Sequence, residues 1–176
     1  MKFFSVLCAI VTSSVIAISC SKSDDTASTP AYTCTTCKTT PDATAANDAS
    51  NKGVYKGVII GSSGTIKFDL QGTTITAVMV LDGVTATLTS TVNVVAGQTY
   101  VAPFTGTLGG QAVSITFSVG ATGQNPTVTT SSIPGHPSST FSIIKETSAS
   151  LIECFEGTYS TTKPEQVRST LSYQEV

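Results

Sequence analysis

Cys34 and Cys37 form the pair of residues whose spacing most suggests chemistry, because Cys-Thr-Thr-Cys separates two thiols by two residues. Such a pair can be a redox centre within a thioredoxin-like βαβ unit, half of a zinc site, or a disulfide. The flanking sequence is rich in Ser and Thr and shows no βαβ pattern, and a zinc site would have to recruit His136 and Cys154. We therefore predict a disulfide between Cys34 and Cys37 formed in an oxidising compartment, with Cys154 as the alternative partner of either thiol.

Residues for general acid–base catalysis are scarce. No Asp, Glu, Lys or Arg lies between Gly83 and Ile144, so His136 is the one residue of that stretch suited to proton transfer near neutral pH. It sits between Gly135 and Pro137 in a predicted turn, with no carboxylate close to it in the sequence. Nucleophile-elbow, phosphate-loop and paired-carboxylate patterns are also missing. The sequence predicts a non-enzymatic protein with no catalytic residue, no metal site and no cofactor.

The N-terminus has the features of an export signal. Lys2 is followed by an apolar run from Phe3 to Ile18, which is interrupted by hydroxyl residues at its middle. One cation, a short apolar segment and a small residue before a cut are typical of a secretory signal peptide. A membrane-spanning helix needs about 20 predominantly apolar residues, so an uncleaved anchor is disfavoured. We predict that residues 1–19 are removed.

The residues at the predicted cut define the next expectation. Ala17-Ile18-Ser19-Cys20 resembles the lipobox of bacterial lipoproteins. The resemblance implies that Cys20 becomes the first residue of the mature protein and carries a diacylglyceryl group on its sulfur. Two or more acyl chains hold a protein stably on a membrane, where a single chain would not.

The segment after Cys20 bears on location. Ser21-Lys22-Ser23-Asp24-Asp25 is similar to the start of Bacteroidetes lipoproteins, in which acidic residues near the cysteine accompany surface display. The resemblance implies an outer-membrane lipoprotein that faces either the cell exterior, which we favour, or the periplasm. From Gly53 onward five basic residues face seven acidic ones without a basic stripe, so nucleic-acid binding is not expected.

Composition divides the mature chain into a stalk and a domain. Residues 20–52 are rich in Ser, Thr, Ala, Asp and Pro and contain no Leu, Ile, Val, Met or Phe. Such a segment buries too little apolar surface to offset its ordering entropy, so we predict a disordered stalk over 20–52. Residues 53–160 form the predicted β domain. Residues 161–176 form a tail or a short helix, since Thr162-Lys163-Pro164-Glu165 resembles a helix-capping box.

The β domain is predicted from alternation and from turns. Ile66, Phe68 and Leu70 alternate with polar residues, which is typical of a strand with one buried face. Asp82-Gly83 and Gly109-Gly110 fit tight hairpin turns. Eight or nine strands are predicted, at 53–60, 64–71, 73–81, 84–95, 99–108, 111–119, 127–133, 139–146 and 150–159. Short connections favour a single antiparallel up-and-down β-barrel, with a two-sheet β-sandwich as the alternative.

Four functions fit these expectations to different degrees. The favoured one is a non-enzymatic envelope or cell-surface module that binds an unknown protein, glycan or small ligand. The alternative is a lipocalin-style carrier, which requires a cavity in place of an interior filled by side chains such as Phe68 and Phe117. A transmembrane barrel is disfavoured because aromatic girdles are missing from its short strands. An enzyme would need a titratable cluster that the sequence does not reveal.

Overall fold

The computed structural model describes residues 37–155, together with the backbone of three short strands that follow them. The described residues are all-β, with one 3-10 turn, η1 (Ala45–Asn47), before the first strand. The main strands are β1 (Val54–Ile60), β2 (Gly64–Asp69), β3 (Ile75–Leu81), β4 (Val84–Ser90), β5 (Tyr100–Leu108), β6 (Gln111–Val119), β7 (Thr127–Ser132) and β8 (Thr140–Glu146). The remaining strands are β9 (Ile152–Phe155), β10 (Thr158–Ser160), β11 (Val167–Ser169) and β12 (Ser172–Glu175).

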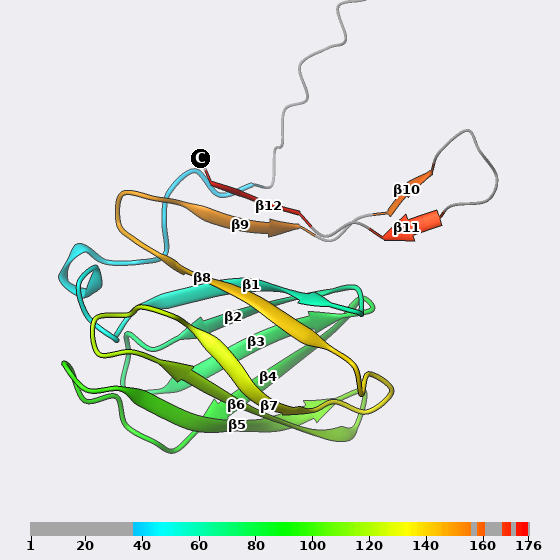
Figure 1. Cartoon of the computed structure of the whole chain (residues 1–176), viewed down its shortest axis with the longest axis horizontal. Coiled ribbons are helices and arrows are strands. Elements are labelled where there is room, and N and C mark those ends of the chain that lie inside the picture. The colour runs from blue at the N-terminus through cyan, green and yellow to red at the C-terminus, as the bar shows by residue number, and fades with distance from the viewer. Residues whose placement is uncertain (1–36, 156–157, 161–166, 170–171, 176) are drawn as a thin grey trace, which may run out of the picture. The chain divides into compact units, whose positions relative to one another are not determined.

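Strands β1–β8 form one antiparallel sheet that curls into a nearly closed barrel (Figure 1). Each strand pairs with its sequence neighbour from β1 to β7, and β8 returns to pair with β1. The sheet order is therefore β7-β6-β5-β4-β3-β2-β1-β8. The predicted all-β antiparallel barrel is confirmed, and the sandwich alternative is not what forms. The sheet still has two edges, because β7 and β8 do not pair with each other.

Two tight turns follow the prediction. Asp82 and Gly83 have φ of 49° and 76°, and Gly109 and Gly110 have φ of 56° and 82°. Positive φ at both central residues is the type I′ conformation, whose twist matches that of the flanking strands. The largest error in a strand boundary is at β4, which ends at Ser90 and not at residue 95. The single strand predicted at 150–159 is two strands, β9 and β10. The Tyr100 hydroxyl donates a hydrogen bond to the Val92 carbonyl at 3.1 Å, which holds the chain after β4 in a loop.

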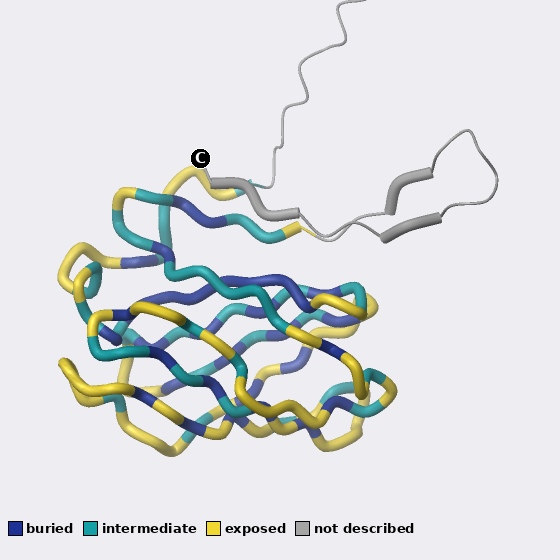
Figure 2. Tube along the Cα trace, viewed as in Figure 1, coloured by how far each residue is buried: buried dark blue, intermediate teal, exposed yellow. Residues whose placement is uncertain are grey.

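Buried residues occur on most strands of the barrel, and most of their side chains join one core (Figure 2). The rings of Phe68 and Phe117 stack with centroids 4.2 Å apart, and Phe104 meets Phe68 edge-on at 5.1 Å. Tyr55 packs on Phe117 at 5.3 Å, and its hydroxyl donates to the Asn51 carbonyl at 2.7 Å. These four rings are completely buried. They are surrounded by further buried residues, namely Ile59, Ile66, Leu70, Met79, Leu81, Leu88 and Ile115.

The predicted disordered stalk is wrong for residues 37–52. This segment packs on the barrel, and its Asn51 side chain is fully buried. Asn51 Nδ2 donates to the carbonyls of Val95 and Gln98, both at 2.8 Å. Lys145 Nζ donates to three carbonyls around η1, including that of Asp48 at 2.8 Å. The segment is ordered by hydrogen bonds to the domain, which a composition argument based on apolar burial does not count. Residues 20–36 of the predicted stalk lie outside the described residues.

Glu146, at the end of β8, joins the segment before β1 to the rest of the molecule. Its side chain is fully buried, and Oε2 accepts hydrogen bonds from the backbone N–H groups of Asp42 at 2.7 Å and Ala43 at 3.1 Å. Oε1 accepts from Lys56 Nζ at 2.5 Å and from the Ile152 N–H at 3.1 Å. A buried carboxylate is tolerated only when its charge and lone pairs are matched in this way.

The C-terminal segment was also predicted incorrectly. Strand β9 pairs with β12, and β10 pairs with β11, both antiparallel. Residues 167–169 and 172–175 are therefore strands, and the predicted short helix is wrong where the chain is described. The capping-box residues at 162–165 lie outside the described residues. Within the described part of the chain, no helix has the length and apolar character needed to cross a membrane.

The contacts of Glu146 predict that its removal lowers the stability of the fold. Glu146→Ala leaves Lys56 and three backbone donors without their acceptor, and we expect a loss of about 3 kcal/mol in the free energy of unfolding. Glu146→Gln keeps the shape of the side chain and should lose less. Urea unfolding of the full-length chain measures both variants. The control is Glu153→Ala on β9, for which we expect a change of at most about 0.5 kcal/mol. Equal losses in Glu146→Ala and the control would refute the role given to Glu146.

Candidate functional site

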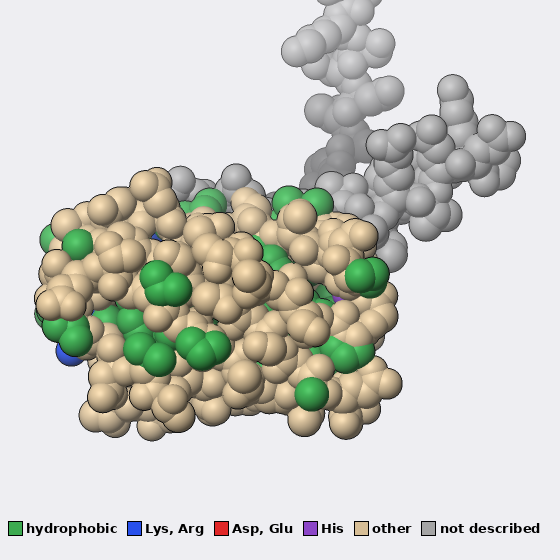
Figure 3. Space-filling view, turned by 60° about the horizontal axis from the view of Figure 1, so that its bottom comes forward, with side chains coloured by type: hydrophobic (Ala, Val, Ile, Leu, Met, Phe, Trp, Pro, Cys, Tyr) green, Lys and Arg blue, Asp and Glu red, His purple; other side chains and the backbone are tan. Residues whose placement is uncertain are grey.

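Charge is segregated on the described part of the chain. The charged residues lie in the segment before β1, on β1, β2, the β3–β4 turn, the end of β8, and β9. The uncharged run from Gly83 to Ile144 covers β4–β7 and most of β8. The surface that carries β5–β7 is accordingly formed by backbone, hydroxyl and scattered apolar groups, with a cation only at its margin (Figure 3). Two grooves therefore differ in chemistry, one on the charged side and one on the uncharged side.

The charged groove has a volume of about 300 Å³ and lies over the outer face of β1–β3. Lys56 Nζ is 3.2 Å from Asp42 Oδ2, and Lys67 Nζ is 3.6 Å from the same oxygen. Lys38 also forms an ion pair with Asp42. The groove is lined by Lys38, Asp42, Lys56, Thr65, Ile66, Lys67, Val78, Val80, Ile152, Glu153 and Cys154. Because its lysines are already paired with carboxylates of the same chain, this cluster fastens the segment before β1 and offers no open anion site.

Asp42 is held in its ionised form. Burial alone would raise the pKa of Asp42, but hydrogen bonds from Lys38 and Lys56 outweigh this effect and lower the pKa to about 2. Ionised Asp42 is therefore bound into the fold throughout the physiological range, as a fixed counter-charge to the lysines.

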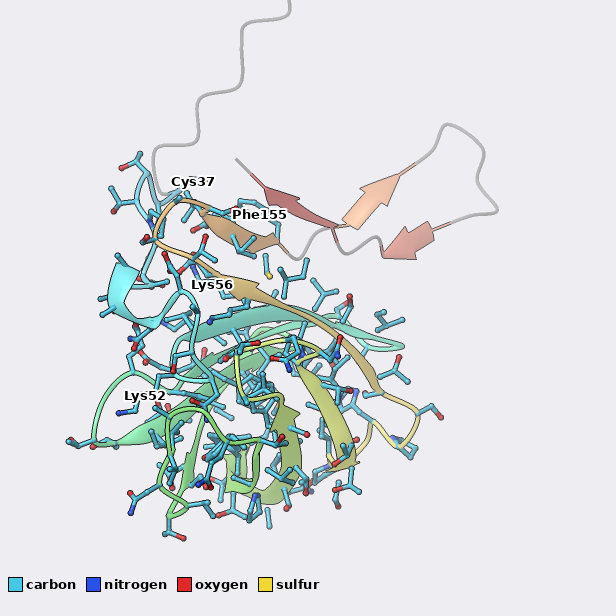
Figure 4. The ribbon with its side chains drawn as sticks, turned by 60° about the vertical axis from the view of Figure 1, so that its left-hand side comes forward. Cys37, Lys52, Lys56 and Phe155 are labelled. Atoms are coloured by element: carbon cyan, nitrogen blue, oxygen red, sulfur yellow. The ribbon has the colours of Figure 1, made fainter. Side chains whose placement is uncertain are left out.

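The predicted cysteine sites have different outcomes. Cys20, the expected lipid-bearing residue, and Cys34 both lie outside the described residues. Cys37 is disulfide-bonded, and Cys154 is a free thiol, so Cys154 is not the partner of Cys37. Burial raises the pKa of the Cys154 thiol to about 11, which makes it a poor nucleophile. Cys37 lies beside β9, on the side of the barrel that carries Lys56 (Figure 4).

His136 has partners that the sequence did not reveal. Its Nδ1 is 2.7 Å from Ser62 Oγ in the β1–β2 turn, and its Nε2 is 3.4 Å from Asp82 Oδ2 in the β3–β4 turn. Ser62 Oγ is also 3.1 Å from the Ser139 hydroxyl. Three turns at one end of the barrel are thereby joined. A serine, a histidine and a carboxylate are also the residue set of nucleophilic catalysis. Only the folded barrel brings them together, because they are far apart in the sequence.

The Asp82 carboxylate is placed too loosely to orient the histidine ring. Its side chain is 59% exposed, and 3.4 Å is longer than the distance of about 2.7–2.9 Å typical of a charge-assisted hydrogen bond. We therefore interpret the His136 contacts mainly as a connection between turns.

The uncharged groove lies between β7 and β8, where the barrel is open. Its volume is about 360 Å³. Six of its eight lining residues carry a hydroxyl group, and the other two are Val128 and Phe141. The hydroxyl residues are Thr127, Thr129, Thr130 and Ser131 from β7, with Ser139 and Thr140 at the start of β8. This groove, here called the seam, has no charged residue in its lining, and sequence reasoning did not identify it.

Metal binding finds no support among the described residues, where no three His, Cys, Asp or Glu side chains converge as a metal site would require. Comparison with protein-family models, with curated proteins and with solved structures gave no match. The features that bear on function are therefore the filled barrel and its two grooves.

The ion cluster at Asp42 predicts acid sensitivity. A folded-state pKa of about 2, against an ordinary value of 3.8, gives stability that is complete above pH 4 and is lost as the pH falls towards 2. We expect the chain to lose about 1–2 kcal/mol through this group over that range, and Asp42→Asn to lack this part of the pH dependence. Denaturant unfolding at several pH values measures it. Asp82→Asn, at an exposed position, is the control, and identical pH profiles for wild type and Asp42→Asn would contradict the prediction.

Proposed function

We propose that the mature chain is a lipid-anchored, non-enzymatic module of the outer membrane, which binds a partner through the outside of its barrel. The likeness of Ala17-Ile18-Ser19-Cys20 to a lipobox supports the anchor, and the acidic residues after Cys20 favour the cell surface over the periplasmic face. The observation that carries the binding role is the contrast between a filled interior and an open seam.

The filled interior argues against the carrier alternative. A lipocalin-style barrel holds its ligand among the inward-facing side chains, at the level where Phe68, Phe104 and Phe117 meet in this chain. These rings contact one another and are completely buried. A ligand could enter only by displacing them, at a cost of several kcal/mol in lost packing. Recognition on the outer surface requires no such rearrangement.

The position of the anchored end supports the same proposal. The described chain begins at Cys37, beside β9 and the charged groove, whereas β5–β7 lie on the other side of the barrel (Figure 1). The described chain thus enters the domain on the side opposite the uncharged surface of β5–β7, which is the side that we propose meets a partner.

Lipid attachment and exposure can be tested in cells. We expect the full-length chain to incorporate labelled palmitate and to fractionate with the outer membrane, and Cys20→Ser to lose both properties. Cys154→Ser is the matched control and should retain both. Protease added to intact cells should remove the domain if it is displayed. Protection in intact cells with cleavage after permeabilisation would place it on the periplasmic face, and palmitate labelling of Cys20→Ser would refute the anchor.

The contact between Ser62 and His136 favours one second candidate, a serine-type hydrolase. In such an enzyme His136 Nδ1 would accept the Ser62 proton as Oγ attacks an ester carbonyl. Because Asp82 is loosely placed, we expect neither labelling of Ser62 by a fluorophosphonate probe nor hydrolysis of p-nitrophenyl acetate above that of Ser62→Ala. Ser131→Ala, which changes an exposed serine elsewhere, is the control. Labelling that disappears only in Ser62→Ala would replace the preferred function with this candidate.

A further inference from the structure

The two edges of the sheet face each other across the seam without pairing. Strand β7 pairs with β6 on one side, and β8 pairs with β1 on one side. No register joins β7 to β8, although both strands are fully described. Each strand therefore directs a row of backbone N–H and C=O groups into the groove between them. Unpaired backbone groups of this kind form a ready template for another extended chain.

The β7 edge lacks the usual protection against such pairing. Natural edge strands carry lysines, prolines or inward-pointing charges, or are covered by other elements. Residues 127–132 read Thr-Val-Thr-Thr-Ser-Ser, without a charge or a proline, and five of these six residues are exposed. One bulge at Thr129 interrupts the pairing with β6. Bulges are common beside functional sites, where they re-aim an edge.

The side chains of β7 leave its outer edge accessible. Thr130 Oγ1 donates to Thr116 Oγ1 at 2.8 Å, and Thr129 Oγ1 contacts the Thr116 carbonyl at 3.4 Å. Both hydroxyl groups are thus directed back to β6. The backbone edge and the apolar surfaces of Val128 and Phe141 remain as the features that the seam offers to a ligand.

We infer that the seam is a recognition site for an extended, uncharged polypeptide segment of a partner protein, which pairs antiparallel with the free edge of β7. The inference rests on the proposed binding function and names its site and the chemistry of its partner. Strand addition supplies affinity through main-chain hydrogen bonds, and shallow pockets beside the edge supply selectivity. The absence of charge from the lining favours a neutral segment, because a charged side chain would lose its hydration there without gaining a counter-ion.

A peptide with the sequence of Gln111–Val119 is a suitable probe. This sequence is uncharged and already pairs antiparallel with β7 on its other edge, so its side chains are compatible with those of β7. The peptide carries a neutral fluorophore, and binding to the detergent-purified full-length chain is followed by fluorescence anisotropy. The comparison peptide has N-methyl groups on alternate residues, which remove main-chain donors and leave the side chains unchanged. We expect N-methylation to weaken binding about tenfold or more, because several main-chain hydrogen bonds are lost.

Charged variants of the chain locate the binding site. Thr129→Lys combined with Ser131→Lys places two charges on the seam and should also weaken binding about tenfold. Thr85→Lys combined with Thr87→Lys adds the same charge to exposed positions of β4 that pair with β3, away from the seam, and should leave the affinity within about twofold. Thermal unfolding followed by circular dichroism verifies that both double variants remain folded.

The results that overturn the inference are specific. Absence of peptide binding up to about 1 mM counts against it, since main-chain recognition tolerates many sequences. If the N-methylated peptide bound as tightly as the unmodified one, the main chain of β7 would not be recognised. The same conclusion would follow if the β4 variant lost as much affinity as the seam variant. Concentration-dependent dimerisation that the seam lysines abolish, without peptide binding, would assign the edge to a second copy. Lost palmitate labelling would defeat the anchored function and leave the peptide result intact, so the two failures are distinguishable.

Discussion

The buried Glu146 carboxylate is the interaction on which the arrangement of the other elements depends. It accepts three backbone N–H groups and the Lys56 ammonium, and these four donors come from the segment before β1, from β1 itself and from the start of β9. Removing a carboxylate from water costs several kcal/mol unless such donors replace its hydration. The carboxylate and the segment before β1 therefore depend on each other. The carboxylate is stable only if the chain around Asp42 is folded onto β8. That chain contains little apolar surface and is otherwise held by polar contacts, such as the ion pair of Asp42 with Lys56 and the hydrogen bond from Gln71 to the Asp42 carbonyl.

Two consequences of this interaction bear on function. It holds the segment before β1 on the side of the barrel that carries β9 and the charged groove, away from β5–β7. It also commits β8 to β1, since Glu146 pairs with Val54 in the β1–β8 register while it binds Lys56. The opposite edge of β8 then faces β7 across the seam. The ion pair between Glu146 and Lys56 therefore helps to hold β8 on β1, and the seam is the gap that remains between β8 and β7.

Much of the fold follows from local sequence, for identifiable reasons. The alternation of Ile66, Phe68 and Leu70 predicted an inward face, and all three side chains are buried. Asp82-Gly83 predicted a hairpin, because few residue pairs tolerate positive φ at two successive positions. Alternation identifies strands and tight turns join neighbours, so an antiparallel meander was accessible without a structure. The sequence did not reveal that the neighbours β7 and β8 stay unpaired while β8 pairs with β1, because this depends on curvature accumulated over the whole sheet.

The site residues were harder to predict, because each depends on a contact between distant parts of the chain. Asp82 and His136 meet only after β3, β4 and β7 have taken their places in the barrel. Residues 37–52 were taken for a stalk because their composition offers no apolar core. These residues are ordered by hydrogen bonds. Their carbonyls accept from Lys145 Nζ, and their N–H groups donate to Glu146. Hydrogen-bond partners supplied by another element leave no periodic pattern in the segment that receives them.

The uncharged, unpaired edge of β7 exposes the chain to aggregation, so its retention calls for an explanation. An edge such as β7 can pair with any extended chain it meets, and evolution usually blocks it with a lysine or a proline at little cost to stability. The chain has lysines on β1 and β2, which are paired on both sides, and none on the edge strand β7. The other edge strand, β8, carries Lys145 and Glu146, but both side chains are bonded within the chain, so they are not free to block an incoming strand. An edge that stays both neutral and unpaired is best explained by a strand that it must accept.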